Sequence, residues 1–368
     1  MDAFLTREGV VADERGVISH AGNPVREQRQ LESGSAIAPR ADRTAIRLTG
    51  TERRSWLDSI TSQSLSALQP GESTELLVLD PQGRVEHAAA VVEDGVTLWL
   101  IVDADDAAPL VKWLTMMRFR ADVAIEIATD VSVIGAMRGG SAADALTSAA
   151  VATGEVPAVW TDPWPAVTAG GWQYAQVPEH PGAEYHWLEA IVADIAPLAG
   201  LPLAGSLAVD ALRIAAWRPR WASEVDERSI PHETDWLRTA VHLNKGCYRG
   251  QETVAKVHNL GHPPRRLAML HLDGSDSVLP EKGDVVYDGD VEAGRITSAA
   301  RHHELGPIAL AILSRRTPGE AELVVAVGEE RIAAAQEIIV PADAGATANV
   351  PRLTRLSRRK QVEPPKVG

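Results

Sequence analysis

The sequence predicts an α+β protein with mostly antiparallel sheets, followed by a C-terminal β-barrel. Three observations lead to this prediction. Short strand-like segments alternate with amphipathic helices up to residue 264. From residue 265 onward, short apolar strands are separated by Gly and Asp turns, with no helical pattern between them. A chain of 368 residues also exceeds one ordinary hydrophobic core, so two or three domains are expected.

The composition is typical of a soluble globular protein, with 45% hydrophobic and 23% charged residues. No apolar run approaches the ~20 residues that a membrane helix needs. The N-terminal residues lack the basic-then-apolar order of a signal peptide, and the single cysteine permits no internal disulfide. These features predict a cytoplasmic protein that does not bind membranes. A net charge of −14 argues against a broad nucleic-acid-binding surface, which would need many Lys and Arg residues.

The regular pattern begins at residues 44–50, which alternate as a half-buried strand does. Thr51 follows as the expected cap of a helix, in which Trp56, Leu57 and Ile60 recur at helical spacing. The sequence therefore predicts a strand that leads directly into a helix.

A β-hairpin is predicted next. Residues 76–79 form an apolar strand, Asp80-Pro81-Gln82-Gly83 fits a type I turn, and residues 84–92 return as the partner strand. The same alternation continues with strands at 95–102, 123–127 and 131–137 and helices at 106–119 and 142–152.

The last part of the chain predicts the barrel. A short helix at 251–257 is stopped by Gly261. Six strands follow, at 266–272, 285–287, 294–299, 308–313, 323–327 and 331–339. We therefore expect a first region at 1–264, a barrel at 265–342, and a basic, disordered tail at 343–368.

The segment Lys245-Gly246-Cys247-Tyr248-Arg249-Gly250-Gln251-Glu252 holds the only cysteine of the chain. If this segment is extended, Lys245, Cys247 and Arg249 share one face, where the two cations favour the reactive thiolate. Gly246 and Gly250 allow backbone conformations, or a close ligand approach, that a Cβ would block. The alternative is that Cys247 is a small buried hydrophobic residue.

The string Lys-Gly-Cys-Tyr-x-Gly-Gln-Glu resembles the motif of the YgfZ-type folate-binding proteins. These belong to the wider family of the glycine-cleavage T protein, an aminomethyltransferase. The resemblance implies a T-protein folate-binding fold, with residues 1–264 as two interleaved lobes and a cleft for tetrahydrofolate or a derivative. It also implies an accessory role in iron–sulfur cluster assembly or repair, and through it support of tRNA modification. Iron–sulfur proteins or assembly factors would be the partners, and Cys247 would be a redox-active thiol or a transient cluster contact.

A second segment carries the same resemblance. Residues 209–217 are similar to the family pattern Ala-x-Asp-x-Leu-Arg-Ile/Leu-Glu-Ala-Gly, with Ala215 in place of the glutamate that contacts the pterin edge. Arg213 taken alone is as consistent with a structural ion pair as with an anion ligand. Many of the seven tryptophans between Trp160 and Trp236 are expected to fill the core, and the alternative for one or two of them is an apolar wall for the ligand ring. The ligand-binding positions that the resemblance implies are Asp210, Arg213, Tyr248, Gly250, Gln251 and Arg265.

The predicted hairpin departs from the family. Aminomethyltransferases carry Gly-Gly-x-x-Asp-Asp there, whereas this chain has Gly83 followed by Arg84, with His87 and Ala88 at the acidic positions. His87 can titrate near neutral pH and joins Cys247 and Lys245 as a catalytic candidate. The departure argues against true aminomethyl transfer. Two alternatives stay open: a folate-dependent aminomethyl or one-carbon transferase, and a folate-free protein-interaction factor on the same fold.

No metal site is predicted. His258 and His262 are spaced i,i+4, but Gly261 interrupts the helical face that they would share. His302 and His303 are expected to form an exposed pair, with no acidic or sulfur partner nearby in the sequence.

Overall fold

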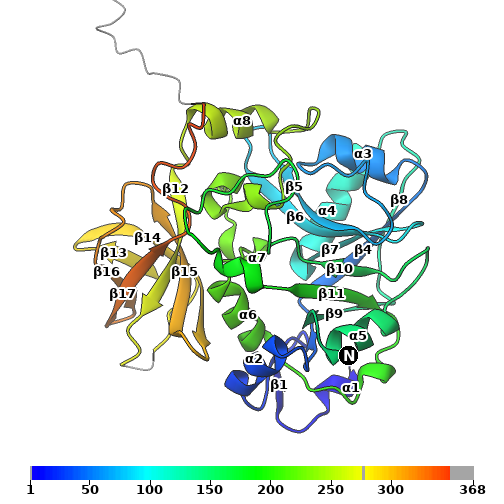
Figure 1. Ribbon diagram of the computed structural model, residues 1–368, viewed down its shortest axis with the longest axis horizontal. Helices are drawn as coiled ribbons and strands as arrows, with labels where there is room; N and C mark the ends of the chain where they lie inside the picture. The colour runs from blue at the N-terminus through cyan, green and yellow to red at the C-terminus, as the bar shows by residue number, and fades with distance from the viewer. Residues whose placement is uncertain (1, 276–277, 349–368) are drawn as a thin grey trace, which may run out of the picture.

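The computed structural model describes residues 2–275 and 278–348 (Figure 1). The N-terminal segment comprises α1 (Asp2–Leu5), β1 (Val10–Ala12), β2 (Ile18–Ala21), α2 (Pro24–Glu32) and β3 (Ala38–Pro39), of which β3 joins the second large sheet. Asn23 caps α2 by accepting a hydrogen bond from the Arg26 amide, and Pro24 suits the first helical position.

The first large sheet has five antiparallel strands in the order β5-β6-β7-β4-β8. Its strands are β4 (Arg43–Thr49), β5 (Ser73–Leu79), β6 (Val85–Glu93), β7 (Leu98–Asp103) and β8 (Ala124–Ile127). Helices α3 (Arg53–Ile60) and α4 (Ala104–Met117) pack on one face of this sheet, around Leu57 and Leu110. Among the described residues, that core is formed by residues between Ile46 and Ile127.

The second sheet has four strands in the order β10-β11-β9-β3. It comprises β3 and then β9 (Ser132–Met137), β10 (Val159–Thr161) and β11 (Trp187–Val192). One face packs on α5 (Ser141–Ala149), and the other meets the first sheet across the central core. Both sheets are antiparallel throughout, because every strand pair within them runs antiparallel.

The segment after the second sheet links the lobes to the barrel. It contains α6 (Ser206–Ala215), α7 (Trp221–Glu224) and α8 (Gln251–Leu260), with short 3₁₀ turns at Ala196–Leu198, Pro231–Thr234 and Trp236–Arg238. A further 3₁₀ turn, Pro181–Glu184, lies between β10 and β11. In Figure 1, α6 runs between the sheets and the barrel, and it packs against both α2 and β14.

The barrel is closed, with the strand order β12-β15-β14-β13-β16-β17. Its strands are β12 (Arg265–Leu272), β13 (Val285–Asp288), β14 (Val291–His302), β15 (Gly306–Ser314), β16 (Leu323–Val327) and β17 (Glu330–Ile338). Alternate apolar residues such as Leu270 and Val325 fill its interior.

The predicted α+β class and C-terminal barrel are confirmed, and most strands lie within a few residues of their expected positions. The Asp80–Gly83 turn is closed by the Gly83 amide, which donates to the Asp80 carbonyl at 2.9 Å. The cap at Thr51 was predicted wrongly: Glu52 precedes α3, and the Thr51 hydroxyl binds Asp122 instead. No helix among the described residues combines the length and apolar character needed to cross a membrane. Most of the predicted basic tail, residues 349–368, lies outside the described residues.

Candidate functional site

The loop around Cys247 is fixed by Lys245. The Lys245 ammonium donates to the carbonyl oxygens of Asp58, Thr61 and Gln63, and its side chain is only 4% exposed. These carbonyls end α3, where the helix dipole favours a cation. Burial lowers the pKa of Lys245, and the Asp58 carboxylate, 3.6 Å away, opposes this effect. Lys245 therefore anchors the loop to the first sheet's helix.

The expected shared face of Lys245, Cys247 and Arg249 is not present. The segment turns instead of extending, so that Arg249 pairs with Glu86 at 2.7 Å while Lys245 points into the α3 terminus. Cys247 is exposed and its thiol is free. The alternative of a buried hydrophobic cysteine is therefore wrong as well. What the structure provides is an accessible thiol on a loop whose two cations are already paired.

The remaining motif residues shape the backbone. Gly250 has a φ of +84° and precedes α8, where an added Cβ would lie 2.6 Å from the Asp80 carbonyl oxygen. The side-chain amide of Gln251 donates through Nε2 to the Lys245 carbonyl at 3.2 Å and closes the loop. Tyr248 is buried, with the Lys245 ammonium 5.6 Å from its ring centroid. Burial raises the pKa of Tyr248, and its hydroxyl has no hydrogen-bond partner among the described residues.

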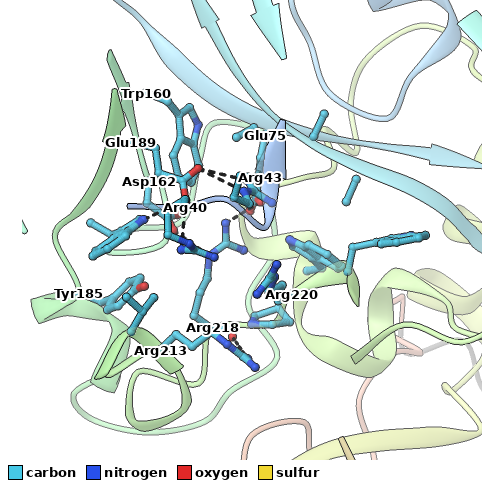
Figure 2. Close-up of a pocket in the computed structure, with 18 residues that line it drawn as sticks. Arg40, Arg43, Glu75, Trp160, Asp162, Tyr185, Glu189, Arg213, Arg218 and Arg220 are labelled. Carbon is cyan, nitrogen blue, oxygen red and sulfur yellow. Dashed lines mark hydrogen bonds and ion pairs between the residues drawn. The ribbon is translucent and has the colours of Figure 1, made fainter. Parts of the chain in front are cut away.

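Between the two sheets lies a buried network of arginines and carboxylates. Figure 2 shows the arginine side chains gathered around a small cavity, of about 70 Å³. Each arginine has at least one carboxylate partner within 4 Å. The pairs are Arg40–Asp42, Arg40–Glu189, Arg43–Asp103, Arg43–Glu189, Arg213–Asp210, Arg213–Glu224, Arg218–Glu75, Arg218–Asp162, Arg220–Asp42 and Arg220–Asp103. The aromatic rings of Trp160, Tyr185, Trp187, Trp221 and Trp236 also line this cavity.

Arg218 forms a separate group within this network, because it shares neither of its two carboxylate partners with another described arginine. Its guanidinium binds Glu75 at 2.7 Å and Asp162 at 2.9 Å, while its buried Nη1 has no hydrogen-bond partner among the described residues. Burial raises the pKa of Asp162, the nearby Arg218 opposes this, and the neighbouring Glu75 raises it further. The cavity therefore combines an unused N–H donor with a carboxyl group that binds its proton more tightly than usual.

Arg213 and Arg265 were expected to hold an anionic ligand, and both are already paired. Arg213 lies between Asp210 at 2.6 Å and Glu224 at 3.1 Å. Arg265 binds Asp226 at 2.6 Å and the fully buried Glu233 at 2.8 Å. Their carboxylate partners leave neither arginine with a free charge for a ligand. Of the two readings left open for Arg213, the structural ion pair is the one observed.

His87 lies away from the central cavity. It is buried on β6 with its Nδ1 2.6 Å from Asp106 on α4. Its neighbour Ala88 lines the cavity, and adjacent residues of a strand point to opposite faces. His87 therefore faces the α4 layer, and the site does not bring it together with Cys247 or Lys245.

A second, larger cavity of about 400 Å³ lies beside the C-terminal end of α6. Ala215 lines it, together with Tyr185, which also borders the central cavity. The polar groups at its wall are Glu32, Arg138, Glu184, His186 and His302. Its volume is in the range of small-molecule pockets, whereas the central cavity is too small for a ring system.

Several residues of these cavities were not identified from the sequence. The arginines of the central cavity come from distant segments of the chain: Arg40 and Arg43 from one, and Arg218 and Arg220 from another. The one signal in the sequence was the close spacing of Arg218-Pro219-Arg220, which places two arginines near each other. Trp217, at the position of the final glycine in the resembled pattern, has a φ of +60° and is fully buried. A large side chain in that conformation is uncommon, and here it fills core volume between the lobes.

Comparison with known proteins agrees with this architecture. Residues 265–338 match the glycine cleavage T-protein C-terminal barrel domain. The crystal structure of glycine cleavage system aminomethyltransferase T from Bartonella henselae is similar, with a TM-score of 0.70 at 15% identity, covering 92% of this chain and 96% of that one. A chloroplastic protein of Arabidopsis thaliana, provisionally named a transferase, is 23% identical over 315 residues, which are 81% of this chain and 69% of that protein. The chain therefore has the glycine cleavage T-protein fold and carries the C-terminal barrel of that family.

Proposed function

We propose that this protein binds tetrahydrofolate or a related reduced folate and acts as an accessory factor in iron–sulfur cluster assembly or repair. The observation that carries the folate part is the 400 Å³ cavity beside Ala215 and Tyr185. In the resembled family, the residue at position 215 contacts the pterin edge. Tyr185 supplies an aromatic wall, and Arg138 and Glu184 supply groups that can bind polar ring atoms.

The geometry speaks against the aminomethyltransferase alternative. The resembled enzymes use an acidic residue on the return strand of the hairpin, whereas His87 here faces α4. Ala215 offers no acceptor to the ring N–H groups. The provisional transferase name of the Arabidopsis thaliana relative is the one observation that favours this alternative.

The folate part is tested by anaerobic calorimetric titration with tetrahydrofolate. We expect saturable binding, and we expect Ala215→Glu to tighten it about tenfold, because an added acceptor satisfies desolvated donors worth about 1–3 kcal/mol. Ala215→Met is the matched control, since it adds a side chain of similar length without a carboxylate or amide acceptor, and it should not tighten binding. An absence of binding by the parent and by Ala215→Glu would favour the folate-free interaction factor.

The iron–sulfur part rests on Cys247, the exposed thiol of the resembled motif. One cysteine cannot supply the thiolates that a stable cluster needs, so any cluster contact is shared with a partner protein or a small thiol. We place this role in the cytoplasm. Cys247→Ser should lower iron–sulfur enzyme activities in cells to the level of a deletion strain, whereas Gly246→Ala should not. Unchanged activities with Cys247→Ser would remove the thiol from the proposal.

A further inference from the structure

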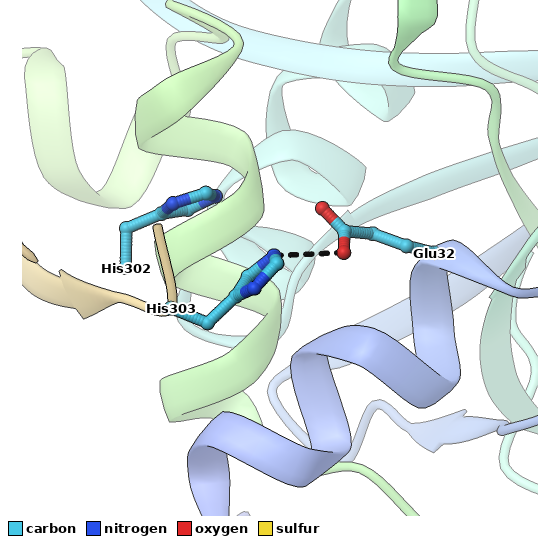
Figure 3. A group of neighbouring side chains, drawn as sticks. All are labelled: Glu32, His302 and His303. Atoms are coloured by element: carbon cyan, nitrogen blue, oxygen red, sulfur yellow. Dashed lines mark ion pairs between the residues drawn. The ribbon is translucent and has the colours of Figure 1, made fainter. Parts of the chain in front are cut away.

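Glu32, His302 and His303 lie together where the barrel meets α2 (Figure 3). Each side chain offers a ligand atom within 4.8 Å of the other two, and the His303 Nε2 lies 2.8 Å from the Glu32 Oε2. The sequence had predicted an exposed histidine pair without an acidic partner. The structure corrects this: His302 is buried, and α2 supplies the carboxylate from a distant part of the chain.

The neighbouring Gln28 holds these groups in place. Its side chain is buried, donates to the Arg301 carbonyl at 2.9 Å, and accepts from the His303 amide at 2.9 Å. Gln28 and Glu32 are one helical turn apart and therefore share a face of α2. The end of β14 is thus fixed against the helix that carries Glu32.

The ligand atoms are of the kind that divalent transition metals bind. Two imidazoles and one carboxylate form a common three-residue ligand set for Zn²⁺ and related ions. His303 gives an independent indication, because its side chain is only 6% exposed and neither of its buried ring nitrogens has a hydrogen-bond partner among the described residues. Nε2 lies 2.8 Å from the Glu32 carboxylate, so a metal bound between these two groups would give this nitrogen a partner.

His302 must change its hydrogen bonding to join such a site. Its Nδ1 accepts from the amides of Glu304 and Leu305, both at 3.2 Å. Coordination through Nε2 places the proton of the neutral ring on Nδ1, so these two long bonds are given up. The new Nδ1–H would face these two amide donors, so coordination also requires the ring or the backbone at Glu304 and Leu305 to turn aside.

We propose that Glu32, His302 and His303 bind a divalent transition metal such as Zn²⁺ and leave a coordination position open toward the 400 Å³ cavity. Glu32 and His302 both line that cavity, so a ligand inside it can reach the metal. Three protein ligands with an open position are typical of metal sites that bind a further molecule. A small molecule with a carboxylate or another anionic oxygen is the ligand class that fits. This site does not depend on folate binding.

Co²⁺ titration of the EDTA-treated full-length protein tests the site, with the visible absorption of the bound ion as the readout. We expect His303→Ala and Glu32→Gln each to weaken binding at least 100-fold, since even outer partners of metal ligands contribute about 10–100-fold. Glu32 is partly exposed, so its substitution should leave the fold intact. Circular dichroism would verify this for each variant.

His271→Ala is the matched control. His271 pairs with Glu337 at 3.2 Å on the barrel surface, outside the group of three potential ligands. Its substitution should leave Co²⁺ binding unchanged. The proposal is overturned if the parent protein binds no Co²⁺, if either ligand variant binds as tightly as the parent, or if His271→Ala weakens binding to the same extent.

Discussion

Gly250 and Gly83 bring two backbone turns into direct contact. A Cβ on Gly250 would lie 2.6 Å from the Asp80 carbonyl oxygen and 3.1 Å from the Gly83 Cα. The same residue has a φ of +84°, which side-chain-bearing residues rarely adopt. Gly250 therefore sets how closely the Cys247 loop approaches the β5–β6 hairpin.

Gly250→Ala should destabilise the protein by at least about 2 kcal/mol, from the left-handed backbone conformation and the close carbonyl contact. Gly246→Ala is the matched control in the same loop, because nothing lies within 4 Å of its Cβ position and its φ is not in the left-handed region. Chemical denaturation of both variants measures the difference. Equal stabilities would show that the loop can move away from the hairpin without cost.

For single residues, the sequence was a good guide to which positions belong to the site. It was a poorer guide to the groups that these residues contact. The Cys247 motif and its glycines were recognisable from residue types alone. The partners of Lys245 were not, because the carbonyls of Asp58, Thr61 and Gln63 belong to a remote helix end. The side of the sheet on which His87 lies could not be predicted either, since strand alternation does not say which face of β6 packs against α4.

Among the elements, β12 connects the barrel to the lobes through its first residue. Arg265 reaches Glu233 in the 3₁₀ turn Pro231–Thr234 and Asp226 in the preceding loop. Burial raises the pKa of Glu233, while Arg265 opposes this effect. The carboxylate is fully buried, so its charge depends on this one arginine.

Arg265→Ala should therefore lower the free energy of unfolding by about 3 kcal/mol, because it leaves a buried carboxylate unpaired. Arg295→Ala is the control: its pair with Glu292 is exposed and should contribute less than about 1 kcal/mol. Thermal or urea denaturation of both variants provides the comparison. A loss of similar size in the two variants would contradict the structural role assigned to Arg265.

The elements themselves were largely predictable, because strand alternation and Gly turns act locally. β16 was predicted with its observed bounds, whereas β14 extends to His302, beyond the predicted end at residue 299. That extension carries His302 to α2 and depends on the buried Gln28, a contact between distant segments. Periodicity in one segment does not report such a contact.

For the whole molecule, two buried groups give opposing dependences of stability on pH. Burial raises the pKa of Asp235 to about 7, although the amides of Tyr174 and Ala175 donate to it. Burial lowers the pKa of His232 to about 3. The contribution of Asp235 to the free energy of unfolding is greatest below about pH 4, and it is lost as the pH rises to 7. The His232 contribution is present above its unfolded pKa and is lost as the pH falls from about 6.5 to 3.

Between about pH 4 and 6.5, the Asp235 contribution falls with pH while the His232 contribution rises. Their effects on the free energy of unfolding should therefore cancel in this range. Asp235→Asn, in which Asn tolerates the φ of +57°, should make stability rise with pH there, by about 1.4 kcal/mol per unit relative to the parent protein. His232→Gln should make stability fall with pH by a similar amount. Urea denaturation across this range measures both slopes. Parallel curves for the parent and Asp235→Asn would show that Asp235 is ionised throughout.

The arrangement of the cores also has a consequence for synthesis on the ribosome. The core under α3 and α4 is complete once Ile127 has emerged, so the five-stranded sheet can form early. Its opposite face belongs to the central core, which also contains Val133 of β9 and Ile191 of β11. The apolar residues Leu77, Val92 and Ile101 on that face therefore stay uncovered at least until the second sheet has been synthesised. During that interval they offer a binding surface for chaperones.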